Sequence, residues 1–254
     1  MISTVILGTG NVAKHLFEAF MSQNGIEVIQ VYGRSLKALS YFNNQINTSS
    51  DLSNIKEADI YLVAISDDAI SEVSKFLVDK RGLIVHTSGS IPMNALPNKN
   101  RCGVFYPLQT FNAHRKVNFK EIPICIEAGN DQDYELLNAL ASAISDKVVQ
   151  IDTDQRKVLH LAAVFANNFT NHMYHIAHEI CIQNDVPFEL LLPLINETAT
   201  KIQDLSPLDA QTGPARRNDK GTFGKHLAQL KSKKHNNIYT LLSKSIQKTY
   251  GKKL

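Results

Sequence analysis

The chain has 254 residues, enough for one large domain or two small ones, and a formal net charge of +3. Its three cysteines are scattered and show no metal-ligand spacing, which favours a reducing compartment over a disulfide-stabilised fold. There is no run of about 18 apolar residues and no leader-like segment before the first predicted strand. We therefore expect a cytoplasmic protein that does not enter a membrane.

Basic residues gather toward the C-terminus. Residues 214–254 contain eleven Lys or Arg and one acidic residue, Asp219. Such a segment could contact nucleic acid, but few aromatic residues accompany it and it contains no recognised binding motif. We interpret it as a solvated helix face and expect no nucleic-acid partner.

A glycine-rich turn follows the first predicted strand, residues 4–7, and precedes a helical pattern. The turn comprises Gly8, Thr9, Gly10, Asn11, Val12 and Ala13. In this context a G-x-G-x-x-A spacing predicts dinucleotide binding. Gly8 permits the tight turn, Gly10 lets the backbone approach a pyrophosphate, and Ala13 lets the helix pack on the strand. The free N–H groups of the helix N-terminus then face the phosphates.

The second predicted strand, residues 27–32, indicates which dinucleotide is favoured. An NAD-binding unit places Asp or Glu at the end of this strand, where it accepts hydrogen bonds from ribose hydroxyls. This chain has Gly33, Arg34 and Ser35 there. Arginine and serine suit a 2′-phosphate, so the sequence predicts NADP(H). The alternative is that Arg34 is a solvated turn residue.

Apolar runs and helical patterns alternate along the next hundred residues. Strands are predicted at residues 58–65, 82–87, 102–106, 122–127 and 147–151, with a helix over 131–144. This alternation predicts an α/β fold with an N-terminal doubly wound parallel sheet of the Rossmann type. Functional loops are then expected at the carboxyl ends of strands, at residues 8–13, 33–35, 66–68, 87–90 and 107–111.

The pattern becomes helical at Asp152. No Gly or Pro occurs from residue 153 to 184, which predicts one long helix. Further helices are predicted over 188–203, 224–230 and 237–250. We therefore expect a dinucleotide-binding domain over residues 1–151 and an all-α domain for substrate binding and dimerisation over residues 152–254.

The predicted long helix has two unlike faces. One face carries an apolar stripe that we expect in the core: Val158, Ala162, Phe165, Phe169, Met173, Ile176 and Ile180. The other carries His160, Asn167, Asn168, Asn171, His175 and His178 in place of the usual Lys and Glu. This composition indicates either a polar cleft or a plain surface, and histidine suits proton transfer near neutral pH.

A metal site on the same helix is a rival interpretation, because His172, His175 and Glu179 have helical spacing. Such a site needs a converging ligand from another element, and the spacing differs from that of zinc hydrolases. We expect no metal.

With this layout, the chain resembles a family of uncharacterised Rossmann-like proteins described as NADP oxidoreductases, which carry a C-terminal helical domain of unknown function. Pyrroline-5-carboxylate reductase, deazaflavin-dependent NADP oxidoreductase and the β-hydroxyacid dehydrogenases have a similar build. The helical part resembles the C-terminal domain of 6-phosphogluconate dehydrogenase. The resemblance covers essentially the full length and is carried by residues 8–13, 33–35, 86–90, 107–111, 163–169 and 212–215, with Arg217 and Asp219.

The resemblance implies where a cofactor lies. NADP(H) would cross residues 8–13, with Arg34 and Ser35 at its 2′-phosphate. Ile65 and Ser66 would lie near the nicotinamide ribose, and Thr87 to Gly89 at the nicotinamide end. The resemblance also implies a homodimer formed through the helical domains.

The chain departs from its relatives at three positions. Tyr106 stands where relatives often have His, and Asn218 where they have Gly. Val164 takes the place of the catalytic Lys of β-hydroxyacid dehydrogenases, so the chemistry of that Lys is not carried over. His160, one turn earlier, could substitute for it.

The leading hypothesis is an NADP(H)-dependent oxidoreductase that transfers hydride to or from a small polar metabolite. His160 is the candidate for proton transfer, and Ser88 and Asn168 for positioning the reacting group. Candidate substrate-binding residues are Gln109, Thr110 and Arg217. Each of three residues has a structural role as the alternative. Ser88 would cap a turn, Asn168 would bond backbone across helices, and Arg217 would form an ordinary ion pair.

Two other functions fit the same sequence. One is an NADP-binding sensor or regulator without turnover, which the missing Lys favours. The other is a deazaflavin-to-NADP hydride carrier, which would need a broad apolar shelf over the nicotinamide.

Overall fold

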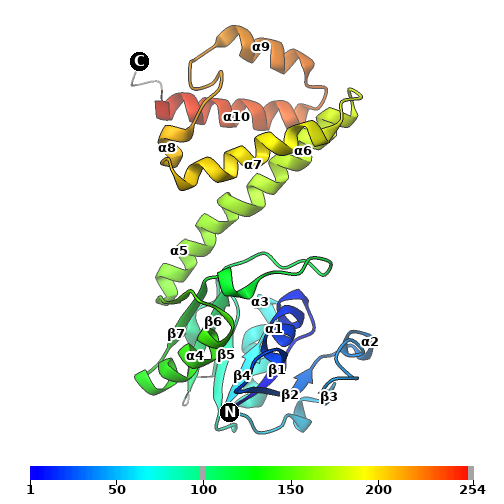
Figure 1. Ribbon diagram of the computed structural model, residues 1–254, viewed down its shortest axis with the longest axis vertical. Coiled ribbons are helices and arrows are strands. Elements are labelled where there is room, and N and C mark those ends of the chain that lie inside the picture. Colours follow the sequence, from blue (N-terminus) through cyan, green and yellow to red (C-terminus); the bar gives the residue numbers. More distant parts are fainter. Residues whose placement is uncertain (98–100, 251–254) are drawn as a thin grey trace. The chain divides into compact units, whose positions relative to one another are not determined.

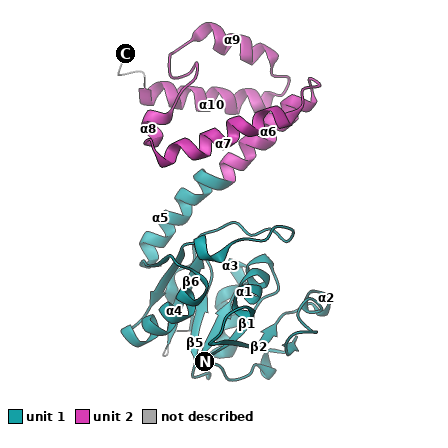
Figure 2. Cartoon of the chain, in the orientation of Figure 1, with its two compact units in different colours: residues 1–167 teal, residues 168–254 magenta. Residues whose placement is uncertain are grey.

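The computed structural model describes residues 1–97 and 101–250, and Lys252 and Lys253 of the basic segment lie outside them. The chain divides into two compact units, residues 1–167 and 168–254 (Figure 2). The division falls inside a π-helical segment, so the helix that begins at Thr153 belongs to the first unit. The domain boundary after residue 151 stays a prediction.

The first unit is built on one sheet (Figure 1). Its strands are β1 (Ile2–Leu7), β2 (Ile26–Tyr32), β3 (Thr48–Ser49), β4 (Ile60–Val63), β5 (Leu83–His86), β6 (Cys102–Pro107), β7 (Ile124–Ala128) and β8 (Val148–Gln150). Among the described residues the order is β3-β2-β1-β4-β5-β6-β7-β8. Strands β1 to β6 are parallel, which confirms the predicted doubly wound fold.

The last two strands run in the opposite direction. Strand β7 is antiparallel to β6, and β8 is parallel to β7. The physical reason is the connection: residues 108–123 return at the carboxyl edge of the sheet without a crossover helix, so β7 starts where β6 ends. The sheet is therefore mostly parallel.

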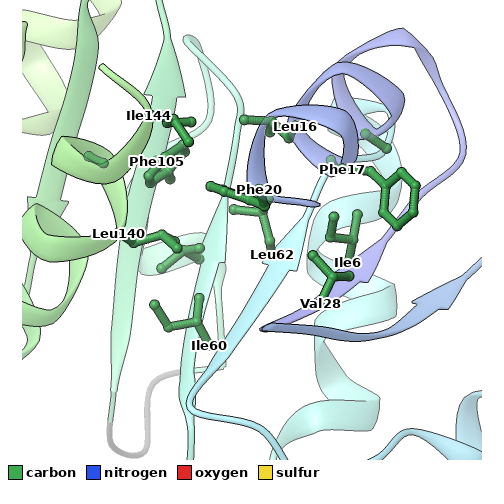
Figure 3. Close-up of a cluster of buried hydrophobic side chains, with 14 of the residues drawn as sticks. Ile6, Leu16, Phe17, Phe20, Val28, Ile60, Leu62, Phe105, Leu140 and Ile144 are labelled. Carbon is green, nitrogen blue, oxygen red and sulfur yellow. The ribbon is translucent and has the colours of Figure 1, made fainter. Parts of the chain in front are cut away.

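Helices cover both faces of the sheet. Helices α1 (Asn11–Met21), α2 (Leu36–Leu39) and α4 (Asp131–Ile144) contribute to one core, and α3 (Asp67–Ser74) to the other. Alternate strand residues enter the two cores, as Ile6 and Leu7 of β1 do. Figure 3 shows the larger core, in which Phe20 of α1 lies among Leu62 of β4, Phe105 of β6 and Leu140 of α4.

The strand order reverses between β1 and β4, which lie side by side at the centre of the sheet. Open α/β sheets bind ligands in the crevice at such a switch point. Because β1 to β6 are parallel, the five predicted functional loops all lie at one edge of the sheet.

The helical run predicted from residue 153 is present, with a change of winding. Helix α5 (Thr153–Ala163), the π-helical segment Val164–Phe169 and α6 (Thr170–Ile182) follow one another directly. The side chain of Asp152 caps α5, and Gln155 completes the capping box. Segments of π-helix are frequent at functional sites, and this one contains Asn167 and Asn168.

The second unit is helical throughout its described part. After α6 come α7 (Leu192–Thr200), α8 (Pro207–Ala210), α9 (Lys220–Gln229) and α10 (Lys233–Tyr250) (Figure 1). No helix in residues 1–97 or 101–250 is both long and apolar enough to cross a lipid bilayer.

The apolar stripe of the long helical run is largely exposed in the single chain, so the expected core position is wrong for its first half. Val158 is 68% exposed and Phe165 63%, whereas Ile176 is 9% exposed. Helical periodicity identifies the residues that share a face but not what covers that face.

Candidate cofactor and catalytic site

The turn after β1 has the geometry that close packing of β1 and β4 requires. Gly8 has φ +136°, and a Cβ there would lie 2.0 Å from the carbonyl oxygen of Ala64. No other residue type fits that position without a shift in backbone. Around Gly10 the space is open, since a Cβ there would meet no atom within 4 Å. Its backbone is therefore accessible to a ligand.

The N-terminus of α1 is free to bind an anion. Gly10 is its N-cap, no side chain caps it, and its first turn contains no acidic residue. By contrast, α3 begins with Asp67 and Asp68. Uncapped N–H groups at a helix N-terminus attract phosphate, so the turn and α1 fit the pyrophosphate of a dinucleotide.

The other residues of the turn hold it in place. The Thr9 methyl group packs against Gly33, where a Cβ would lie 2.4 Å from it. Asn11 Nδ2 donates to the carbonyl oxygen of Phe111 at 3.1 Å. Val12 packs against the larger core, and Ala13 is fully buried in it.

The residues predicted at the 2′-phosphate lie just after β2. Arg34 is exposed, and no hydrogen bond or ion pair engages its guanidinium within the described residues. The Ser35 hydroxyl caps α2 and accepts the N–H of Ala38 at 3.3 Å. Arg34 is therefore available to an anionic ligand at this edge.

The residues predicted around the nicotinamide follow β4 and β5. Ile65 is partly buried, and Ser66 is the N-cap of α3 although its side chain makes no capping bond. Thr87 N–H donates to the carbonyl oxygen of Val63 at 3.3 Å. This hydrogen bond keeps the ends of β4 and β5 adjacent.

Ser88 has a turn-stabilising geometry. Its side chain is buried, and Oγ accepts the N–H groups of Ser90 and Ile91, each at 3.1 Å. Those two donors occupy the lone pairs that a substrate would otherwise meet. The contacts support a turn cap, and the polarising role of Ser88 stays a prediction.

A histidine–tyrosine pair lies at the same edge of the sheet. The Tyr106 hydroxyl, near the end of β6, lies 3.1 Å from Nδ1 of His160 on α5. Gly89 touches both rings: a Cβ there would lie 2.6 Å from Nδ1 of His160 and 2.9 Å from Cζ of Tyr106. The structure thus brings together predicted residues Gly89 and His160, and it adds Tyr106.

A buried arginine fixes the start of α5. The Arg156 side chain is 0% exposed and forms a 2.5 Å ion pair with Glu127 of β7. Its Nε donates to the carbonyl oxygen of Ser88 at 3.2 Å, and Nη2 donates to that of Ile91 at 2.5 Å. Burial lowers the pKa of Arg156, and Glu127 opposes that shift. This network ties α5 to the loop that carries Gly89.

The sequence interpretation missed both Arg156 and the role of Tyr106. One signal for Arg156 was available: it lies four residues before His160, on the same face of the helix, where a positive charge must find a partner.

His86 at the end of β5 is held neutral. It is 0% exposed, and its Nδ1 accepts the N–H of Ser88 at 3.2 Å. Burial, assisted by the charge of Arg156, lowers the pKa of His86 to about 4. A ring that does not take up a proton near neutral pH is unsuited to acid–base catalysis, so His86 supports the loop instead.

The remaining candidates are exposed side chains. Gln109 and Thr110 are exposed just after β6, and Thr110 N–H donates to Gln109 Oε1 at 2.8 Å. Asn168 and Arg217 belong to the second unit and are both exposed. The pKa of Asp219 is lowered mainly by the hydrogen bond from the backbone N–H of Thr222, and to a smaller extent by the charge of Arg217. Their roles toward a substrate stay predictions.

Glu179 of α6 lies close to two histidines. Glu179 lies 3.2 Å from Nε2 of His235 and 3.7 Å from Nε2 of His175, while the His172 and His175 rings stack with centroids 6.0 Å apart. In the part of the chain that the structure describes, no group of three or more His, Cys, Asp or Glu side chains could hold a metal ion.

Two family models and one solved structure place the chain among known proteins. Residues 3–88 match the model "NADP oxidoreductase coenzyme F420-dependent", and residues 122–246 match a domain of unknown function, DUF2520. The crystal structure of "putative NADP oxidoreductase BF3122" from Bacteroides fragilis is 42% identical over 97% of this chain and 98% of that chain, with a TM-score of 0.90. The chain belongs to this NADP oxidoreductase family. Membership confirms the predicted cofactor class, NADP(H).

More distant structures share the fold of the family. Pyrroline carboxylate reductase from Plasmodium falciparum, solved with NADP bound, is 15% identical over 98% of this chain and 97% of its own, with a TM-score of 0.62. An imine reductase from Myxococcus stipitatus in complex with NADP+ is 15% identical over 99% and 95%, with a TM-score of 0.68. No curated protein sequence matches the chain at a significant level.

Proposed function

We propose that the protein is an NADP(H)-dependent oxidoreductase that acts on a C=N or C=O bond, or its reduced counterpart, in a small polar metabolite. The observation that carries the proposal is the position of two features at one edge of the sheet. The uncapped phosphate cradle follows β1, and the Tyr106–His160 pair lies against Gly89 after β5. A cofactor site and a proton-transfer group are the two parts that such an enzyme needs.

Each residue then has a defined role. The backbone at Gly8 and Gly10 and the first turn of α1 bind the pyrophosphate, and Arg34 binds the 2′-phosphate. When bound, NADPH supplies the hydride. His160 exchanges the proton that accompanies it at the nitrogen or oxygen of the substrate. Two NADP-bound structures of the same fold, one named a pyrroline carboxylate reductase and the other an imine reductase, favour C=N substrates as the first to test.

Replacing Arg34 with Ala will weaken NADPH binding by about tenfold to a hundredfold and leave NADH binding unchanged, because only NADPH carries the 2′-phosphate. The measurement is a fluorescence titration with each cofactor. Arg81→Ala is the matched control, since Arg81 is also exposed but lies at the opposite edge of the sheet, before β5. If the intact chain binds neither cofactor, the proposal is wrong.

A turnover assay distinguishes an NADP(H)-dependent enzyme from an NADP-binding sensor. NADPH consumption is followed with a panel of small imines and carbonyl compounds, beginning with 1-pyrroline-5-carboxylate. Tight NADPH binding with no consumption by any compound would favour the sensor or regulator function instead.

We also propose a homodimer formed through the second unit, which presents many apolar side chains. Leu190 and Leu241 are each 69% exposed and Leu194 is 62% exposed. Exposed apolar side chains gathered on one unit favour a protein–protein interface, and a second copy of the chain would cover them. Light scattering will give the mass of a dimer, and Leu241→Glu will shift it toward monomer. Phe76→Glu, at a 62% exposed apolar residue of the first unit, is the control that keeps the dimer. A monomeric intact chain would contradict the proposal.

A further inference from the structure

Two rings from distant parts of the sequence meet at the carboxyl edge of the sheet. Tyr106 on β6 and His160 on α5 are joined through the Tyr hydroxyl and Nδ1. Their ring planes cross at 72° with centroids 6.0 Å apart. Since Nδ1 is engaged and no hydrogen bond reaches Nε2 within the described residues, Nε2 is the ring nitrogen available to a substrate.

The pair is fixed from several sides. Tyr106 is 9% exposed and packs with Val104 and Cys125. Gly89 lies against both rings, so any side chain at position 89 would displace them. Arg156 holds the turn of α5 before His160 against the carbonyl oxygens of Ser88 and Ile91. The hydrogen bond is therefore part of a packed arrangement rather than a chance contact of two mobile side chains.

Tyr106 can fix the ring without adding a charge. A phenol oxygen both accepts and donates a hydrogen bond. Burial raises the pKa of Tyr106 above its ordinary value, so the hydroxyl keeps its own proton near neutral pH. Where the phenol oxygen accepts from Nδ1–H, the histidine is held in the neutral tautomer that carries its proton on Nδ1.

We propose that Tyr106 is a positioning residue: its oxygen accepts the Nδ1–H of His160 and thereby leaves Nε2 as the nitrogen that exchanges a proton with the substrate. The inference rests on the proposed oxidoreductase function. In the direction of reduction, the protonated ring gives its Nε2 proton to the substrate heteroatom as the carbon receives hydride from NADPH. In the direction of oxidation, the Nε2 lone pair takes the proton from the heteroatom as hydride leaves to NADP+. Nδ1 keeps its proton in both directions of the reaction, so Tyr106 itself transfers no proton.

The experiment is 15N NMR of the full chain labelled at histidine, recorded without substrate about two pH units above the ordinary histidine pKa of about 6.5. The signals of His160 are assigned by their loss in His160→Gln. We expect the proton on Nδ1 in the intact protein and a shift of the population toward Nε2 in Tyr106→Phe. Tyr239→Phe is the matched control, because the Tyr239 hydroxyl makes the same kind of bond, 2.8 Å long, to Nδ1 of His226 in the second unit. It should alter the His226 signals and leave those of His160 unchanged.

Two results would overturn the inference. One is a proton on Nε2 of His160 in the intact chain, and the other is an unchanged tautomer in folded Tyr106→Phe. If Tyr106→Phe does not fold, Gly89→Ala gives the same readout, since its Cβ must separate the rings while both side chains remain. On a substrate from the turnover screen, Tyr106→Phe should lower kcat about tenfold or more with KM for NADPH unchanged, and add nothing to His160→Ala. The tautomer does not depend on cofactor binding, so failure of this inference is distinguishable from failure of the proposed function.

Discussion

Replacing Arg156 with Met will lower the free energy of unfolding by about 3–5 kcal/mol, because it leaves Glu127 without its cation in a largely buried place. The arginine is 0% exposed and the Glu127 side chain 14%. Two carbonyl oxygens, of Ser88 and Ile91, also lose their donors. Among the described residues, the Thr153 hydroxyl alone would still donate to the Glu127 carboxylate, at 2.8 and 2.9 Å. Denaturant unfolding measures the change.

The matched control is an exposed ion pair of the same unit. Lys120 and Asp146 lie 3.3 Å apart with side chains 49% and 70% exposed. Water screens such a pair, so Lys120→Met should cost at most about 1 kcal/mol. Combining Arg156→Met with Glu127→Gln should restore part of the loss, since the second change removes the stranded charge. A loss below about 1 kcal/mol in Arg156→Met would show that water reaches Glu127 and that the network does not secure α5.

The parts of the site that are contiguous in sequence could be predicted. Residues 8–13 form the turn and the helix start by themselves. The positive φ of Gly8 and the open space at Gly10 follow from their positions between β1 and α1. The sheet could be predicted for a similar reason, since apolar runs and helical periods are local patterns.

The direction of β7 and the catalytic pair needed the folded structure. A strand pattern does not carry a direction, which depends here on how residues 108–123 return. The pairing of Tyr106 with His160 joins positions 54 residues apart. Arg156 finds its partners in the loop after β5 and on β7 only when α5 packs there. In the sequence, Tyr106 is a departure from relatives and Arg156 an ordinary helix residue.

The apolar stripe shows a different reason for a wrong prediction. The helical period places Val158 and Phe165 on one face, but a single chain does not bury them. An apolar face needs a partner surface, and that surface can belong to another copy of the chain. The dimer proposed through the second unit would account for Leu190, Leu194 and Leu241.

Replacing His160 with Ala will lower kcat about a hundredfold or more, which corresponds to about 2.7 kcal/mol of transition-state stabilisation. Its Nε2 is the ring nitrogen of the pair that Tyr106 does not engage. His86, at the end of β5, does not replace it, because burial lowers the pKa of His86 to about 4. The affinity for NADPH should not change, since the phosphate cradle lies after β1 rather than on α5. Steady-state rates with the compound found in the turnover screen, together with the NADPH titration, measure both.

His175→Ala is the control, since His175 is exposed on the second unit and pairs with Glu179. It should leave kcat within about twofold. The solvent deuterium isotope effect on kcat reports proton transfer directly. It should be present in the intact enzyme, where proton transfer from Nε2 accompanies hydride transfer. If His160→Ala retains kcat within about threefold and the same deuterium effect, the proton comes from water and the Tyr106–His160 pair is structural. A large loss of kcat with unchanged affinity for NADPH would assign proton transfer to His160. In that case the variant would still bind the cofactor, and the loss would lie in the chemical step.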